Sequence, residues 1–226
     1  SLIGSNDYWV VKTDNLGNIE WQNTIGGTSV DELKSIDQTS DGGYILAGNS
    51  RSNIGGDKTE NHFGGLSNDV WVVKLNSFGS IVWQNNIGGG SSEWTGSITE
   101  NSDGSFILAI TSSSEASADK SEGNQDTDGG LISYDMWIVK MSSTGSIVWE
   151  NTIGGNDNDW AISAHEVAGG YIVGGFLNSG ISADFTESPI GGAGSNDCIL
   201  IYLDSSGTIV WQNRIGGTGH DYMQDL

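Results

Sequence analysis

The sequence has little of what several protein classes depend on. Its 226 residues include one cysteine, Cys198, so an internal disulfide is excluded. No stretch keeps a helical period of apolar residues, which disfavours a helical fold. Eight residues are Lys or Arg against 29 Asp or Glu, for a formal net charge of −21. Because phosphate backbones and anionic lipids repel such a surface, we expect neither nucleic acid nor membranes as partners.

Catalytic motifs are also missing. The three histidines, His62, His165 and His220, are isolated and lack the spacing of zinc ligands. The sequence has no GxSxG elbow, no CxxC pair and no phosphate-binding glycine loop. We therefore expect a protein that is not an enzyme. It shows no signal peptide and no membrane span, and we expect its targeting segments to lie elsewhere, because it opens within a repeat.

What the sequence does contain is a repeat. The motif Asn-x-Ile-Gly-Gly follows a tryptophan four times, at separations of 62, 66 and 62 residues. Each unit contains four short apolar runs with the alternation of β-strands, separated by turns rich in Gly, Asn, Asp and Ser. The four copies of the motif are residues 23–27, 85–89, 151–155 and 213–217.

Units of about 60 residues with four antiparallel strands predict an all-β fold of the β-propeller class, built of four-stranded blades. The expected divisions are a half blade at 1–27, blades at 28–89, 90–155 and 156–217, and the start of another at 218–226. These about three and a half blades are fewer than propellers usually have. We expect part of a larger ring; the alternative is a four-bladed ring whose closing blade is shared by both ends.

The last strand of each unit shows one apolar face. In the second unit, Ile81, Trp83, Asn85 and Ile87 share it, which predicts packing against a neighbouring sheet. The asparagine on that face should bind a backbone group, since a buried unpaired amide costs about 1–3 kcal/mol. We expect the tryptophans to be buried between blades, and the Gly-Gly pair to sit where a Cβ would clash or strain the backbone. These tryptophans are Trp21, Trp83, Trp149 and Trp211.

The longest connections fall on one face of the predicted disc, where binding residues usually lie. Each of three long insertions contains Asp, any residue, Thr or Ser, then Glu. These carboxylates either bind a cation or polar ligand, or form a helical capping box in a single turn. The pairs are Asp57 with Glu60, Asp119 with Glu122, and Asp184 with Glu187.

The longest insertion also resembles a calcium loop. Asn124, Asp126, Asp128 and the residue Asp135 occupy the first, third, fifth and twelfth places of an EF-hand-like pattern. Calcium prefers six to eight oxygen ligands, and the backbone carbonyl of Gly130 would add one. The sequence therefore predicts calcium as the cofactor here. The alternative is a merely acidic loop.

Two tryptophans follow the glycine pairs closely, Trp94 beside Glu93 and Trp160 beside Asp159. They fall at the loop end of the first strand of a blade. Aromatic rings there either stack on sugar rings or wedge adjacent blades apart.

The segments SNDYWVVKTDNLGNIEWQNTIGG and QTSDGGYILAGNS, with GGDKTEN between blades, resemble the repeat-propeller regions of large secreted or surface-anchored Bacteroidetes proteins, often exported by the type IX secretion system. The resemblance implies an extracellular or cell-surface location and no reaction. The expected function is a non-catalytic structural or interaction module with a protein or glycan partner on the long-loop face. The alternatives are a lectin-like carbohydrate-binding propeller and a hydrolase whose active site lies in missing blades.

Overall fold

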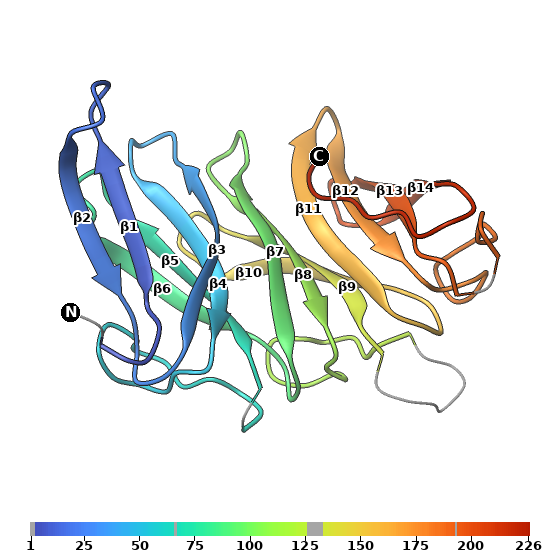
Figure 1. Cartoon of the computed structure of the whole chain (residues 1–226), viewed down its shortest axis with the longest axis horizontal. Coiled ribbons are helices and arrows are strands. Elements are labelled where there is room, and N and C mark those ends of the chain that lie inside the picture. Colours follow the sequence, from blue (N-terminus) through green and yellow to red (C-terminus); the bar gives the residue numbers. More distant parts are fainter. Residues whose placement is uncertain (1–2, 66, 126–132, 193) are drawn as a thin grey trace.

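The chain forms four antiparallel β-sheets in sequence order (Figure 1). The computed structural model describes residues 3–65, 67–125, 133–192 and 194–226, and no helix occurs within these ranges. The first sheet is a hairpin of β1 (Tyr8–Thr13) and β2 (Ile19–Ile25). The three others have four strands each, and each strand pairs with the next along the chain. The all-β prediction is confirmed.

The four-stranded sheets are blade-like meanders. Their strands are β3 (Asp31–Gln38), β4 (Tyr44–Ser50), β5 (Asp69–Leu75) and β6 (Ile81–Ile87); β7 (Glu93–Glu100), β8 (Phe106–Ser112), β9 (Asp135–Met141) and β10 (Ile147–Ile153); and β11 (Asp159–Val167), β12 (Gly170–Leu177), β13 (Asp197–Asp204) and β14 (Ile209–Ile215). We call β3, β7 and β11 the inner strands and β2, β6, β10 and β14 the outer strands.

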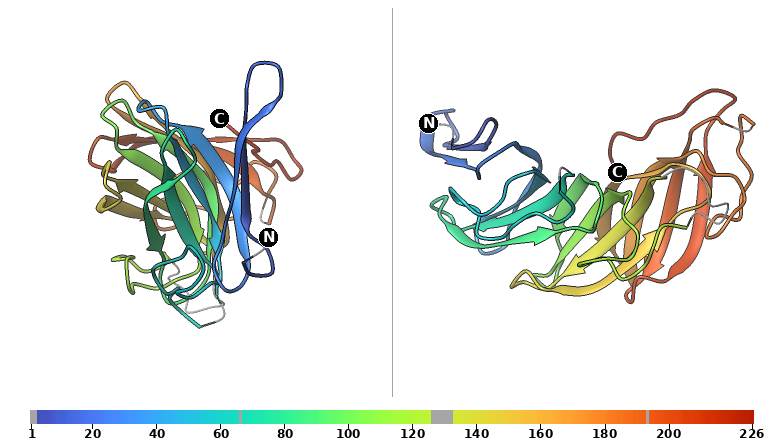
Figure 2. Two further views of the ribbon diagram at one scale, coloured as in Figure 1. Left: turned by 90° about the vertical axis from the view of Figure 1, so that its left-hand side faces the viewer. Right: turned by 90° about the horizontal axis from the view of Figure 1, so that it is seen from below.

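The sheets stack face to face along an open arc and do not close into a ring (Figure 2). The β1–β2 hairpin lies at one end of the arc and the β11–β14 sheet at the other. This arrangement agrees with β-propeller blades, because a propeller repeats such sheets around an axis.

The hydrophobic core lies between consecutive sheets. Tyr8 and Val10 of β1 pack with Trp71 and Val73 of β5, and all four are buried. The next two interfaces repeat this pattern, since Val70 and Val72 pack with Trp137, and Met136 and Ile138 pack with Ile199. One face of each central strand therefore contacts the preceding blade and the other face contacts the following one, as side-chain alternation requires.

Each hairpin that leads into an outer strand turns at a left-handed glycine. Gly79 and Gly145 have φ of 78° and 90°, and Gly17 and Gly207 have φ of 84° and 88°. Glycine adopts this conformation without the steric penalty of a Cβ. The turn glycine inferred from the sequence therefore has the backbone conformation expected of it.

Candidate functional site

The Gly-Gly pair at the end of each outer strand makes room for side chains from other strands. A Cβ on Gly88 would lie 2.7 Å from Cγ of Asp69, and one on Gly89 would lie 2.5 Å from Cβ of Ser114. Neither glycine has a positive φ. The sequence suggested two reasons for the glycine pair, a clash of a Cβ or a strained backbone, and the clash is therefore the one that applies.

The second glycine of each pair donates to a buried carboxylate at the start of the next inner strand. Asp31, Glu93 and Asp159 accept these amides at 2.7, 3.1 and 2.9 Å. Serine hydroxyls complete the site, as Ser112 and Ser114 both donate to Glu93. Burial raises the pKa of Glu93 to about 7 and that of Asp159 to about 8. These carboxylates therefore fix the backbone segment that connects each outer strand to the next inner strand.

The paired carboxylates of the insertions bind backbone amides. Each Asp accepts from the first glycine of the preceding outer strand, and each Glu accepts from an amide in the outer strand of its own sheet. The distances lie between 2.7 and 3.2 Å for Asp57 and Glu60, for Asp119 and Glu122, and for Asp184 and Glu187. Sequence reasoning missed this role, because the amide partners are about 30 residues away.

These insertions contain a tight hairpin turn instead of the helical turn of a capping box. Gly55 and Lys58 exchange two backbone hydrogen bonds, of 3.0 and 3.1 Å. The residue after the first of them is left-handed in every copy, with φ of 61° at Gly56, 51° at Ala118 and 45° at Ala183. The capping-box interpretation is wrong, because no helix starts there.

A positively charged side chain is buried beside each hairpin turn. Nζ of Lys58 donates to Ser50 at 2.8 Å and to Asn86 at 2.7 Å. Burial lowers its pKa to about 8, although the carboxylates of Asp31 and Asp69 oppose the shift. Lys120 takes the same place in the next blade. In the last blade Phe185 occupies this turn position, and Arg214 of β14 supplies the positive charge instead. Its Nη1 donates to Oδ2 of Asp197 at 3.2 Å.

The predicted calcium loop is described only at its two ends. Oδ1 of Asn124 accepts from Nζ of Lys120 at 3.1 Å, and its Nδ2 donates to the carbonyl of Ser133 at 2.8 Å. Oδ2 of Asp135 accepts from the amide of Gln125 at 2.6 Å. The other predicted ligands, Asp126, Asp128 and Gly130, lie outside the described residues. Calcium at this loop stays a prediction.

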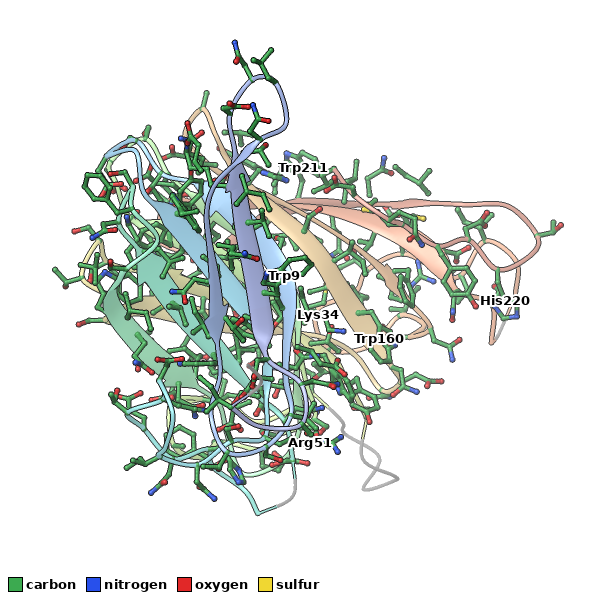
Figure 3. The ribbon with its side chains drawn as sticks, turned by 60° about the vertical axis from the view of Figure 1, so that its left-hand side comes forward. Trp9, Lys34, Arg51, Trp160, Trp211 and His220 are labelled. Atoms are coloured by element: carbon green, nitrogen blue, oxygen red, sulfur yellow. The ribbon has the colours of Figure 1, made fainter. Side chains whose placement is uncertain are left out.

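The two loop-end tryptophans have different surroundings. Trp160 (Figure 3) stacks with Tyr134 at 5.1 Å and with Phe176 at 6.1 Å between ring centroids. Its ring therefore packs against other aromatic rings of the protein. Trp94 instead lines a pocket of about 230 Å³ together with Glu32, Asn49, Arg51 and Asn68.

The outer-strand tryptophans clamp the turn of the following sheet. Trp83 lies on Gly145, where a Cβ would come within 3.0 Å of the ring, and Asn85 donates to the Gly145 carbonyl at 2.8 Å. Trp21 with Asn23, and Trp149 with Asn151, repeat this on Gly79 and Gly207. The predicted backbone partner of the asparagine is confirmed in these three copies. The prediction that the fourth tryptophan is buried is wrong, because Trp211 is 45% exposed and no turn among the described residues lies against it.

A serine links the inner strands. Ser35 accepts the amide of Ile98, and Ser97 accepts that of Ala164, both at 3.1 Å. A register shift immediately precedes each of these serines in its strand. Such an irregularity re-aims the following side chain, here toward the next blade.

No group of His, Cys, Asp and Glu suited to a metal ion occurs in the described ranges. The same part of the chain has no helix long and apolar enough to cross a membrane.

The fold and its repeated contacts define an open array of blade-like, propeller-type sheets. No family model matches the chain, and no curated protein does. Among solved structures it is similar to a protein of unknown function from Bacteroides caccae, at 11% identity, over 93% of this chain and 94% of that one, with a TM-score of 0.30. A TM-score this low carries no argument about function.

Proposed function

We propose that this chain is a non-catalytic interaction and scaffolding module that acts outside the cell or at its surface. One observation carries the proposal: the carboxylates that recur in every blade are engaged with backbone amides. Asp57 and Glu60 hold two outer strands in this way, and Glu93 holds the crossing between blades. A catalytic pair needs carboxylates that face a substrate. The location outside the cell rests on the sequence resemblance.

Hydrolase assays and localisation test this proposal. The purified chain is incubated with chromogenic glycosides, esters and phosphates, and no turnover above buffer is expected. Turnover that Glu93→Gln or Glu60→Gln abolishes would refute it. Recovery of the protein in the medium or on intact cells, accessible to added protease, is the expected location.

A glycan-binding role is the second candidate, and the pocket beside Trp94 favours it. Trp94 and Asn49 line this pocket, and Nε1 of Trp94 and Nδ2 of Asn49 are buried without an acceptor among the described residues. Glu32 and Arg51 add polar groups, and an aromatic ring with a few fixed polar groups suits a sugar.

An array of neutral oligosaccharides, followed by calorimetric titration of any hit, tests this role. Trp94→Ala should abolish binding and Asn49→Ala should weaken it at least tenfold, about 1.4 kcal/mol. Trp160→Phe is the matched control, because the Trp160 ring is stacked within the fold and away from this pocket. Binding that survives Trp94→Ala would rule this pocket out.

A further inference from the structure

The two ends of the arc expose the two halves of one interface. Within the chain, this interface between consecutive blades forms three times, with a tryptophan and an asparagine on one side and a turn glycine on the other. The side chains of each formed interface are buried or half-buried. At the ends of the arc, no sheet formed by the described residues lies against the same side chains.

One half is exposed on β13 and β14. Ile215 is 45% exposed, whereas the equivalent Ile87 and Ile153 are fully buried. Trp211 (Figure 3) is exposed to the same extent, and within the described residues Asn213 has no turn carbonyl to bind, whereas Asn85 binds that of Gly145. This face has the residues that clamp a following turn but no turn to clamp in the described chain.

The other half is exposed on the β1–β2 hairpin. Trp9 (Figure 3) is 64% exposed, whereas the equivalent Trp71 and Trp137 are fully buried under the preceding sheet. Nε1 of Trp9 nevertheless donates to Oε1 of Gln22 at 3.2 Å, as Trp71 donates to Gln84 at 3.0 Å. The ring is therefore already held as in the formed interfaces, and no atom lies within 4 Å of a Cβ built on Gly17.

The segment after β14 leaves room for a hairpin. Asp221 accepts the amide of Gly217 at 2.6 Å, as Asp31 accepts that of Gly27. The segment then crosses β12, where Met223 and Leu226 contact Gly174 and Tyr222 contacts Phe176. It takes the place of a following inner strand and leaves the β13–β14 part of the face uncovered.

We infer that the β1–β2 hairpin of a second copy of this chain docks head to tail on the β13–β14 face. Trp211 and Asn213 clamp the Gly17 turn of the second copy, and its Trp9 covers Cys198 as Trp71 covers Tyr8. This interface continues the one already formed three times in the chain. It joins two different surfaces, so repetition of the contact closes a ring or extends a filament.

Molecular mass as a function of concentration tests the inference. In sedimentation or light scattering, the mass should rise above the 23.8 kDa of one chain between about 1 and 100 μM. Trp9→Ala and Trp211→Ala should each raise the concentration of half-assembly by about 30-fold, as for a central interface residue. Mixing the two variants should restore assembly in part, because one wild-type interface forms between them. Two identical surfaces would show no such recovery.

Phe78→Ala is the control, because Phe78 is 82% exposed and lies in the turn between β5 and β6, outside β13, β14 and the β1–β2 hairpin. Unchanged melting temperatures at low concentration show that the variants fold. Alkylation of Cys198 should slow at high concentration in the wild type and not in Trp9→Ala. A constant mass of one chain, or assembly indifferent to both substitutions, overturns the inference.

Discussion

A buried positive charge persists in three blades although its position in the sequence changes. Lys120 reaches the carbonyl of Ser114 from a hairpin turn at 2.9 Å. In the last blade Phe185 occupies that turn position, and Arg214 reaches the equivalent carbonyl of Ser179 from β14 at 2.5 Å. A carboxylate as buried as Asp197 needs a partner charge, since removal of one member of such a pair costs about 3–5 kcal/mol.

Arg214→Thr, which introduces the residue found at the equivalent position 152, should therefore lower the unfolding free energy by about 3 kcal/mol. Adding Phe185→Lys should recover part of that loss, because the lysine returns the charge from the turn. A urea-denaturation double-mutant cycle measures the coupling between the two positions. Additive effects of the two substitutions would contradict the inference that a positive charge at position 185 can replace the one at position 214.

The buried Glu93 makes stability depend on pH. Its folded-state pKa is about 7, above the usual 4.5, because burial penalises the charged form. The folded protein then binds more protons than the unfolded chain between these values, so stability falls as pH rises from about 4.5 to 7. Burial also raises the pKa of Asp159, to about 8, so Asp159 likewise makes stability fall as pH rises.

Urea midpoints at pH 5, 6, 7 and 8 should decrease in that order, with a loss of about 3 kcal/mol from Glu93 alone. Glu93→Gln should make the decline between pH 5 and 7 shallower and leave the part that comes from Asp159. An equal decline in the wild type and in Glu93→Gln would show that Glu93 is ionised in the folded state throughout.

At the scale of elements, the outer strand and the next turn form one unit of interaction. Trp83 and Asn85 of β6 bind Gly145, whose φ of 90° already favours glycine. The ring also excludes a Cβ at that place. The turn glycine is therefore required both by its own conformation and by contact with the preceding blade.

Trp83→Ala should lower the unfolding free energy by about 3 kcal/mol, the lower part of the range for large aromatic deletions, because the ring is half-buried. Trp211→Ala, the same change without a following turn, should cost less than about 1 kcal/mol when measured at concentrations too low for assembly. Chemical denaturation compares them directly. Equal losses would show that the clamp contributes nothing beyond local packing.

Calcium is expected to stabilise the insertion that contains Asn124 and Asp135. A divalent cation would neutralise carboxylates that otherwise repel one another, and would have to replace Lys120 at Oδ1 of Asn124. After chelator treatment, millimolar calcium should raise the melting temperature, and Asp126→Ala with Asp128→Ala should abolish the rise. An unchanged melting temperature in the wild type would identify an acidic loop without a calcium site.

At the scale of the whole molecule, the sequence predicted what repeats locally. Alternation along 81–87 and the turn glycines identified the strands and hairpins, because both signals lie within a few residues. The prediction that Ile81 shares a face with Trp83 is wrong, because a register shift at this point of the ladder turns Ile81 toward the preceding sheet. The role of Glu60 could not be predicted from the sequence, because the amide that it binds belongs to Asn86, 26 residues further along the chain. The exposure of Trp211 was likewise missed, because burial depends on a sheet that its own strand does not contain.

A stack in which each blade contacts only its neighbours should unfold from its ends. Amide hydrogen exchange should be slowest in β8 and β9, which have a sheet on either side, and faster in β1 and β13. Mass spectrometry of peptic peptides resolves these strands. Uniform protection across all four sheets would indicate one cooperative unit instead.

Each blade has a clamp on its outer strand and a turn that receives the clamp of its predecessor. Loss of residues 28–89 would bring Trp21 onto Gly145 in place of Gly79, and that contact is the same in kind. In-frame duplication or deletion of one whole unit therefore leaves every junction chemically matched. Recombination between repeats of the gene can lengthen or shorten such a protein by 62 or 66 residues at a time without first evolving a new interface.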